Sequence, residues 1–268
     1  YVKEKGAPIV IKADGLAAGK GVVVAKTLEE AEKAVNDLMS GASVGEAGKK
    51  LVIEEYLQGV EISVLAAVSV TEESSSKNTA CIKAFLPSRD HKRLMDGAKG
   101  PNTGGMGAVC PLSDVTKETM YLFDKNILQP TLKGIIAEKM DYRGFIFFGL
   151  MITKDGPKAL EYNVRLGDPE TQAVLPMMDF DFAELCLSII DGSLSKFDMK
   201  WKNGFQVAPV AVSGGYPLKY AKNKAISFDE NLIRNTGAKI FIAGAIKDRR
   251  ETKPALLTSG GRVLACSA

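Results

Sequence analysis

The sequence is poor in the side chains that most often mark a nucleophilic or zinc-dependent enzyme. It holds a single histidine, His91, and four cysteines, none of which form a CxxC pair. A lone histidine with no identifiable serine or cysteine partner is weak evidence for a catalytic triad. Scattered cysteines favour reduced thiols in a cytosol-like compartment over a disulfide framework or a zinc site.

Two further absences restrict the partners that the sequence suggests. No apolar run reaches the roughly 18 residues needed to span a bilayer. The net charge of +3 is too small to argue for binding to nucleic acid or to a membrane surface. The chain has 268 residues, of which 46% are hydrophobic, so it can form one large domain or two smaller ones with a sizeable core. It begins with Tyr1 and stops inside an expected strand, so we interpret both ends as cut.

Strand and helix patterns alternate along the chain. The segment 27–40 is typical of an amphipathic helix, with Thr27 and Glu30 at capping-box spacing and a buried stripe of Leu28, Ala31, Val35 and Leu38. Strands are expected at 8–13, 21–26, 50–57, 61–68, 143–153 and 157–164. Helices are expected from 116, interrupted or ended near Pro130, and at 181–192. The segments 71–78 and 86–111 are predicted to be loops. From about residue 201 short β segments dominate, which places a domain boundary near residues 195–202.

A glycine-rich loop lies between the first two expected strands. It matches neither the P-loop nor the dinucleotide fingerprint, because its spacing differs and a strand, not a helix, follows. Such a loop could fold over a polyphosphate, with backbone N–H groups and two ammonium groups facing the charge. The alternative is a mobile surface hairpin. The residues concerned are Lys12, Gly15, Gly19, Lys20 and Gly21.

Charged residues also gather in two later segments. Glu54, Glu55 and Glu61 lie at strand ends, where they could form a hinge that meets adenine and ribose, or could simply be solvated. The loop around His91 contains Lys92 and Asn102 among many glycines, which is typical of a segment that covers an anionic ligand.

The segment 159–172 places three functional groups on one strand face. Because residues two apart share a face, Glu161, Asn163 and Arg165 point the same way. Carboxylate and amide oxygens suit Mg²⁺, and a guanidinium can stabilise charge on a phosphoryl group. The alternative is a solvent-facing strand with an internal ion pair. An acidic turn with Asp168 and Glu170 follows directly, which this alternative explains less well.

Four segments, in this order, resemble the ATP-grasp superfamily and, within it, the phosphoribosylamine–glycine ligases (glycinamide ribonucleotide synthetases). They are "PIVIKADGLAAGKGV", "VIEEYLQGVEIS", "DHKRLMDGAKGPNTGGMGA" and "EYNVRLGDPETQ". The resemblance covers essentially the whole chain, and the third and fourth segments are specific to this ligase. It implies an α+β ATP-grasp fold, with a small lid subdomain at 1–70, a large subdomain with the metal site at 71–198, and a partial β-rich C-terminal domain at 199–268.

The resemblance also implies roles for the residues singled out above. Lys12 and the loop with Gly15, Gly19, Lys20 and Gly21 would hold the ATP phosphates. Adenine would meet the backbone of Glu54, Glu55, Tyr56 and Leu57, and Glu61 would bind ribose. Glu161 and Asn163 would hold Mg²⁺ or Mn²⁺. Lys92, Asn102 and Arg165 would line the phosphate and acyl-phosphate region, and Asp168 would lie near the glycine and amine substrates.

The implied reaction joins glycine to phosphoribosylamine through glycyl phosphate, at the expense of ATP, in de novo purine synthesis. The chain departs from the family pattern at Arg89, Val60 and Ala98. It lacks the first nucleotide-fold domain and part of the last domain of the family, and fusion to other purine enzymes is compatible with the cut ends. Two other interpretations stay open: another ATP-grasp ligase or a protein like the biotin-dependent carboxylases, and a nucleotide-binding fragment without turnover.

Overall fold

The computed structural model describes residues 1–15, 17, 21–248 and 255–268. The chain folds as two compact units, Tyr1–Gln58 and Gly59–Ala268. The first boundary differs from the predicted division at residue 70, because the strand Val60–Val70 pairs only with strands of the second unit among the described residues. The division into 1–70, 71–198 and 199–268 otherwise stays a prediction.

The first unit is a three-stranded antiparallel sheet with one long helix. The strands β1 (Ile9–Ala13), β2 (Val22–Ala25) and β3 (Leu51–Glu55) lie in the order β2-β1-β3. The other elements are the helices α1 (Val2–Lys5) and α2 (Leu28–Met39) and the 3₁₀ segment η1 (Gly45–Lys49). The core of this unit joins Ile9 and Ile11 of β1 to the buried face of α2.

Helix α2 forms where the sequence predicts it, with two differences in detail. The Thr27 hydroxyl accepts a hydrogen bond from the Glu30 N–H, but the Glu30 carboxylate accepts from the Lys26 N–H instead of closing a capping box. Leu28 is 39% exposed, so the predicted buried stripe is wrong at that position, and Ala34 is buried in its place. The buried face is therefore centred on Ala31, Ala34 and Leu38.

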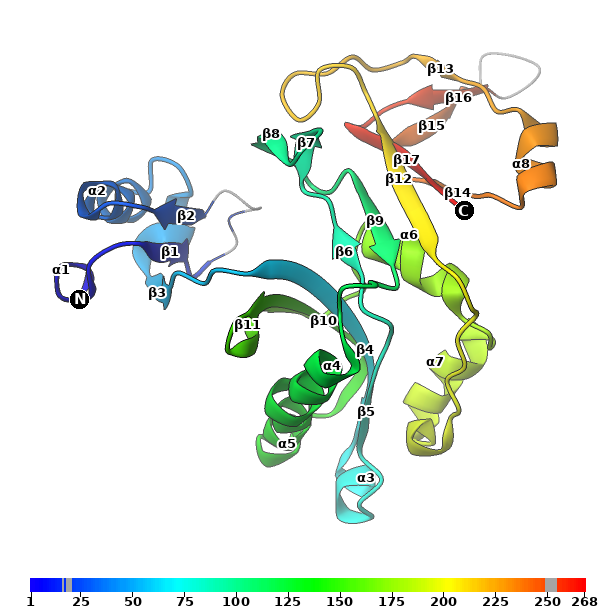
Figure 1. Ribbon diagram of the computed structural model, residues 1–268, viewed down its shortest axis with the longest axis horizontal. Coiled ribbons are helices and arrows are strands. Elements are labelled where there is room, and N and C mark those ends of the chain that lie inside the picture. The colour runs from blue at the N-terminus through cyan, green and yellow to red at the C-terminus, as the bar shows by residue number, and fades with distance from the viewer. Residues whose placement is uncertain (16, 18–20, 249–254) are drawn as a thin grey trace. The chain divides into compact units, whose positions relative to one another are not determined.

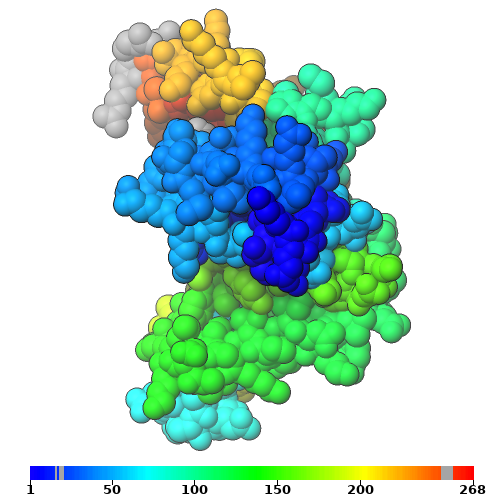
Figure 2. Space-filling view, turned by 90° about the vertical axis from the view of Figure 1, so that its left-hand side faces the viewer, coloured from blue at the N-terminus to red at the C-terminus, as the bar shows by residue number. Residues whose placement is uncertain are grey.

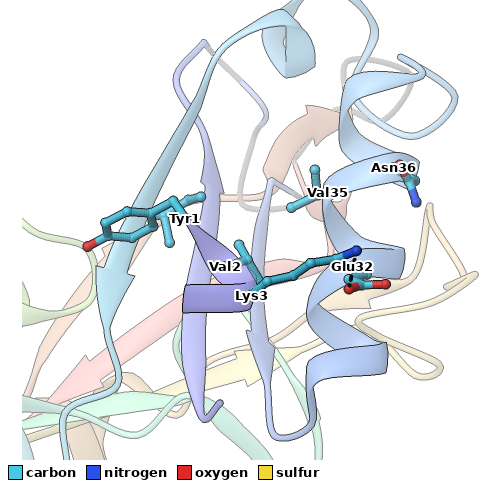
Figure 3. Close-up of a pocket in the computed structure, with 7 residues that line it drawn as sticks. Tyr1, Val2, Lys3, Glu32, Val35 and Asn36 are labelled. Carbon is cyan, nitrogen blue, oxygen red and sulfur yellow. Dashed lines mark ion pairs between the residues drawn. The ribbon is translucent and has the colours of Figure 1, made fainter. Parts of the chain in front are cut away.

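A cavity of about 460 Å³ lies in the first unit beside α1 and α2. Figure 3 shows the side chains around it and the ion pair between Lys3 and Glu32, whose charged atoms are 3.5 Å apart. The cavity is lined by Tyr1, Val2, Lys3, Glu32, Val35, Asn36 and Ile53, none of which is a predicted site residue.

The second unit is built on a four-stranded antiparallel sheet in the order β11-β10-β4-β5. These strands are β4 (Val60–Val70), β5 (Cys81–Ala84), β10 (Tyr142–Thr153) and β11 (Gly156–Asn163). Strand β4 is buried from Ile62 onward because helices cover both faces of the sheet. Side chains of one parity, such as Val64 and Val68, join one core, and Leu65 and Ala67 join the other.

The two faces are covered by different helices (Figure 1). One face carries α4 (Lys117–Phe123), a π-helical segment η2 (Asp124–Leu128) and α5 (Gln129–Ala137). The π segment precedes Pro130, which has no N–H to continue the α-helical ladder, so the predicted interruption is confirmed. The other face carries α6 (Glu170–Val174), η3 (Leu175–Met177), α7 (Phe182–Asp191) and η4 (Leu194–Lys196).

A second sheet in this unit joins distant parts of the chain. Its order is β14-β17-β12-β9-β6. The strands β6 (Arg89–Asp90) and β9 (Gly107–Cys110) come from the region predicted to be an irregular loop, and that prediction is wrong there. Their partners come from the C-terminal part: β12 (Gln206–Val212), β14 (Lys239–Ile242) and β17 (Arg262–Ser267).

The remaining elements are short. The strands β7 (Arg93–Met95) and β8 (Lys99–Asn102) form a hairpin, and β13 (Ala225–Ile226), β16 (Ala255–Thr258) and β15 (Ala245–Asp248) form a small sheet. Helix α8 spans Glu230–Thr236. The segment predicted to be a polar loop contains helix α3 (Glu72–Ser76), capped reciprocally by Thr71 and Ser74 and lying at the surface (Figure 2, cyan).

Within the described ranges, we find no helix with both the length and the apolar character needed to cross a membrane. All four cysteines are free thiols.

Candidate active site

The ribbon of β10 and β11 places the predicted metal ligands side by side. Glu161 lies opposite Gly149, and Asn163 lies opposite Phe147. The Asn163 side-chain amide donates to Glu161 Oε1 at 3.2 Å. Tyr162, between them, turns to the other face and packs edge-on against Phe148, with ring centroids 5.2 Å apart. The predicted alternation is therefore present for Glu161 and Asn163, where it brings a carboxylate and an amide together on one face, but β11 ends at Asn163, so Arg165 lies beyond the strand.

Glycine at position 149 leaves room for this pair. A Cβ atom there would lie 3.0 Å from Glu161 Cγ and 3.4 Å from Phe147 Cε1. The sheet register also shifts next to Gly149, at a β-bulge beside Leu150. Bulges re-aim side chains, and here the bulge sets the direction in which Glu161 leaves the strand.

Lys92, just after β6, lies among carboxylates. Its ammonium forms an ion pair with Glu61 at the start of β4. Burial lowers the pKa of Lys92, but the carboxylates of Glu61, Asp90 and Glu161 outweigh that effect, so the pKa of the ammonium lies above its ordinary value. The ammonium is therefore firmly charged at neutral pH. The structure thus brings together Glu61, Lys92 and Glu161, which the sequence predicts for ribose, phosphate and metal.

A cavity of about 670 Å³ in the second unit adjoins this cluster. It is bounded by the start of β4, by β6 and by the β7 side of the β7–β8 hairpin. Its lining includes Glu61, Asp90, His91, Lys92 and Met106. The cavity is large enough for a small anionic ligand, and its wall combines charged side chains of both signs with apolar ones such as Val60, Leu94 and Met95.

Two acids, the buried Glu170 and the half-buried Asp90, lie beside these residues although the sequence analysis assigns them no role. Glu170, at the first turn of α6, is 4% exposed and accepts a hydrogen bond from Ser63 Oγ at 2.9 Å. Burial raises the pKa of Glu170. Burial and the neighbouring Glu170 carboxylate raise the pKa of Asp90 to about 7. Asp90 Oδ1 is buried and has no hydrogen-bond partner among the described residues.

The sequence does contain an indication of these two acids. Asp90 stands inside the quoted Asp-His-Lys motif, and Glu170 inside the acidic turn. What the sequence does not indicate is that the two carboxylates lie near enough to repel each other, which depends on residues far apart in the chain. The Ser63–Glu170 hydrogen bond, for example, spans 107 positions.

Asp168 and Arg165 lie on either side of the turn that leads into α6. Asp168 Oδ2 pairs with the Arg262 guanidinium at 2.8 Å, and Asp168 Oδ1 accepts from the Gln172 side chain at 2.8 Å. Arg165 stacks over the Phe147 ring at 5.8 Å and donates to the Leu166 carbonyl at 2.8 Å. Its positive charge acts on Glu170, so it faces the same group of acids.

Asn102 ends the β7–β8 hairpin, opposite Arg93, and is exposed. The next residue, Thr103, donates to the Lys92 carbonyl through both its N–H and its hydroxyl, each at 2.8 Å. The hairpin is thus joined at its base to the segment that carries Lys92.

The first unit holds the other predicted nucleotide-binding residues. Lys12 in β1 forms an ion pair with Glu54 in β3, with the charged atoms 2.6 Å apart. The Gly15 N–H donates to the Ala47 carbonyl at 3.2 Å, and Gly21 accepts from the Ala13 N–H at 2.8 Å. Glu55 and Tyr56 are exposed, and Leu57 is half-buried. Gly19 and Lys20 lie outside the described residues.

Comparison with protein families adds evidence of a different kind. Residues 1–171 match the ATP-grasp (A) domain of phosphoribosylglycinamide synthetase, and residues 206–268 match its C domain. The chain belongs to the phosphoribosylglycinamide synthetase family. The predicted fold, an α+β ATP-grasp core followed by a β-rich C-terminal domain, is therefore confirmed.

Individual members of this synthetase family align along the whole chain. The chain is 49% identical over 268 residues to a phosphoribosylamine–glycine ligase of Clostridium acetobutylicum, and covers 60% of that protein. It is 45% identical over 269 residues to the ligase of Vibrio vulnificus, and covers 59% of it. The chain thus spans about 60% of the length of these curated relatives.

Solved structures agree with this assignment. The crystal structure of the phosphoribosylamine–glycine ligase of Thermotoga maritima has a TM-score of 0.79 at 37% identity, over 99% of this chain and 62% of that one. Biotin carboxylase from Campylobacter jejuni, solved with a β,γ-ATP complex, has a TM-score of 0.64 at 14% identity, over 100% of this chain and 54% of that one. At 14% identity, the likeness to biotin carboxylase shows a shared fold alone.

Proposed function

We propose that the protein carrying this chain is an ATP-dependent carbon–nitrogen ligase that joins glycine to 5-phosphoribosylamine. The products are glycinamide ribonucleotide, ADP and phosphate, which places the protein in de novo purine synthesis. The names of its relatives in the synthetase family support this proposal. The observation that carries it is the approach of Lys92 to a carboxylate–amide pair, Glu161 and Asn163, within the region that matches the A domain.

The residues at this pair fit a divalent cation. Their donors are a carboxylate and an amide oxygen, which are hard ligands, and both stand on the same face of β11. Mg²⁺ commonly takes one or two protein carboxylates and completes its shell with water and substrate phosphates. Glu161 and Asn163 would hold Mg²⁺ or Mn²⁺, and the bound cation would neutralise charge on the nucleotide phosphates.

The proposed reaction has two steps. A carboxylate oxygen of glycine bonds to the γ-phosphorus of ATP while the bond from that phosphorus to the bridging oxygen breaks, releasing ADP and leaving glycyl phosphate. The amine nitrogen of phosphoribosylamine then bonds to the glycyl carbonyl carbon. The bond between that carbon and the bridging oxygen breaks, phosphate leaves with this oxygen and the electron pair, and the amine nitrogen loses a proton.

The protein's own side chains have positioning and electrostatic tasks in this scheme. Lys92 and Arg165 are cations beside the predicted metal ligands and Glu170, where they can balance charge on a transferring phosphoryl group. Asp168 is oriented through both carboxylate oxygens, which suits a residue that fixes a substrate amine. Glycyl phosphate is labile in water, so the site must also exclude solvent.

The nucleotide-binding roles that the resemblance implies are part of this proposal. Lys12, Gly15, Gly19, Lys20 and Gly21 are assigned to the phosphates, Glu54–Leu57 to adenine, Glu61 to ribose and Asn102 to the phosphate region. Glu61 is paired with Lys92. A ribose hydroxyl that bonded to Glu61 would compete with this pairing and leave the Lys92 ammonium available for phosphate.

The test is ADP release by the complete protein with Mg²⁺, ATP, glycine and freshly formed phosphoribosylamine. ADP release is expected to require all of these and to be accompanied by glycinamide ribonucleotide. Glu161→Ala is expected to abolish release while the unfolding midpoint stays close to that of the parent, because Glu161 is exposed. Release that is equally fast with other carboxylates in place of glycine would contradict the proposed substrate.

The isolated chain is a separate case, because it spans about 60% of its relatives' length. Binding of Mg·ATP by residues 1–268 without glycine-dependent ADP release would assign this chain nucleotide binding alone. Turnover by the complete protein decides the proposal in either case.

A further inference from the structure

A side chain of strand β17 reaches two segments of the candidate site, one at Gly104 and the other at Asp168. Arg262, the first residue of β17, donates through one terminal nitrogen to the Gly104 carbonyl at 2.6 Å and to the Asp168 carbonyl at 3.0 Å. Its other terminal nitrogen pairs with Asp168 Oδ2 at 2.8 Å. The Arg262 side chain is 25% exposed and that of Asp168 is 52% exposed, so the pair lies at the edge of the solvent. One guanidinium therefore joins three segments that lie far apart in the sequence.

A second C-terminal residue holds the same glycine. The Tyr216 hydroxyl accepts a hydrogen bond from the Gly104 N–H at 2.9 Å. Gly261, next to Arg262, lies so close to the Tyr216 ring that a Cβ there would be 2.3 Å from Cδ2. Both polar backbone groups of Gly104 are thus satisfied by side chains from the C-terminal part of the chain.

Gly104 is connected to Lys92 and Asp90 through its neighbours in the chain, Thr103 and Gly105. Thr103 is tied to the Lys92 carbonyl by two hydrogen bonds, and its hydroxyl also accepts from the Gly105 N–H at 3.0 Å. Gly105 has φ +113°, and a Cβ there would lie 2.4 Å from Pro169 Cδ and 2.7 Å from Asp90 Oδ1. A displacement of Gly104 would therefore move the Lys92 backbone and uncover Asp90.

We propose that Arg262 is a positioning residue for the ligation reaction. It orients the Asp168 carboxylate directly and holds Lys92 in place through Gly104 and Thr103. This inference rests on the proposed function, and it assigns to the C-terminal sheet a direct part in shaping the A-domain site. The geometry needs a planar fork of donors that can meet two carbonyls and a carboxylate at once, which a lysine ammonium on a flexible stem supplies poorly.

The chain offers a matched control in Arg143. Its guanidinium also forks onto a carboxylate, that of Asp141, at 2.6 Å and 2.9 Å, and also donates to a backbone carbonyl, that of Ile190, at 3.3 Å. It does so at the end of the sheet where β10 begins, and within the described part of the chain it bonds to no predicted site residue. Arg143→Lys therefore loses the same kinds of contact outside the site.

The test compares Arg262→Lys with Arg143→Lys in the complete protein. Arg262→Lys is expected to lower kcat for glycine-dependent ADP release about 100-fold, the scale of a misplaced catalytic group, while KM for ATP changes less than about threefold. Arg143→Lys is expected to leave both constants unchanged. In Arg262→Ala, millimolar guanidinium should restore part of kcat by refilling the vacated position, and it should not stimulate the parent.

The results that would overturn the proposal are specific. An Arg262→Lys variant with kcat within about threefold of the parent removes the positioning role. The positioning role is also removed if kcat falls in Arg262→Ala, guanidinium does not restore it, and the fraction of folded protein falls in parallel. A parent without glycine-dependent ADP release would instead overturn the proposed function, so the two failures are distinguishable.

Discussion

At the scale of single residues, the site has more carboxylates than its cations balance. Glu61, Asp90 and Glu161 all act on the one ammonium of Lys92, and Glu170 lies close to Asp90. Such a group of acids is unfavourable unless one of them is protonated or cations bind. The acids thus favour binding of a divalent cation at Glu161, which the proposed reaction needs, and they also favour retention of a proton at Asp90.

The raised pKa of Asp90 leads to a prediction about stability. In the unfolded chain this carboxyl ionises near pH 3.8, but in the folded protein it ionises at about 7. Folding is therefore opposed increasingly as pH rises from about 4 to 7, because the unfolded state loses the proton first. Asp90→Asn, which cannot ionise, should escape this cost. Its advantage in unfolding free energy over the parent is expected to grow by about 2 kcal/mol between pH 5 and pH 8, measured by urea denaturation.

Asp141→Asn serves as the control for this titration. The pKa of Asp141 is lowered, chiefly by its hydrogen bond from Arg143, so Asp141 is ionised at both pH values. Its substitution should shift stability equally at pH 5 and pH 8. A constant difference between Asp90→Asn and the parent over the same range would show that the Asp90 proton is not retained on folding.

What the sequence predicts well at this scale is local. The shared face of Glu161 and Asn163 follows from the two-residue period of a strand, which needs no knowledge of the rest of the fold. The roles of Asp90 and Glu170 depend on burial and on Ser63, which lies in a different strand. No periodicity within their own segments indicates that they meet.

At the scale of elements, the β10–β11 ribbon is the part that the proposed chemistry depends on most. Its bulge at Gly149 and Leu150 sets the direction of Glu161, and the opposite face is packed through Phe148 and Tyr162 against α4 and its neighbours. The ribbon is thus packed on one face and carries the predicted metal ligands, Glu161 and Asn163, on the other. Sites on such elements hold geometry better than sites on loops.

Gly149→Ala tests this arrangement. The added methyl group would lie 3.0 Å from Glu161 Cγ, so the carboxylate has to shift by a few tenths of an ångström. We expect kcat with Mg²⁺ to fall about tenfold, and the unfolding midpoint to change by only a few degrees, because the neighbour that yields is an exposed side chain.

Gly144→Ala in the same strand is the control, since a Cβ atom there meets nothing within 4 Å. It should retain the activity of the parent. Equal activity of Gly149→Ala and Gly144→Ala would mean that the position of Glu161 is not restricted by its neighbour across the ribbon.

The sequence predicts elements correctly where the hydrophobic pattern is long. It fails where a strand forms by pairing with a segment far away in the chain. Helix α2 and strands β4, β10 and β11 have clear periodicity or long apolar runs. The region around β6 and β9 is rich in glycine and proline, and β9 becomes a strand because it pairs with β12 almost a hundred residues later. Helix α3 was missed because its sequence, "EESSS", has no apolar face.

At the scale of the whole molecule, the family match and the sheet topology complement each other. The A-domain match ends at residue 171 and the C-domain match begins at 206, yet β9 from the first pairs with β12 from the second in one sheet. The change to short β segments in the sequence predicts a domain boundary near residues 195–202. It cannot indicate that strands on either side of that boundary share a sheet. Arg262 and Tyr216 use this proximity to reach the Gly104 loop.

The most direct test of the account is the position of the cation in a crystal of the complete protein grown with Mn²⁺ and a non-hydrolysable ATP analogue. The account predicts an anomalous manganese peak within bonding distance of a Glu161 carboxylate oxygen and the Asn163 amide oxygen, bridging to the terminal phosphate of the analogue. A nucleotide bound with its manganese on other side chains, while Glu161 and Asn163 still bond only to each other, would contradict it.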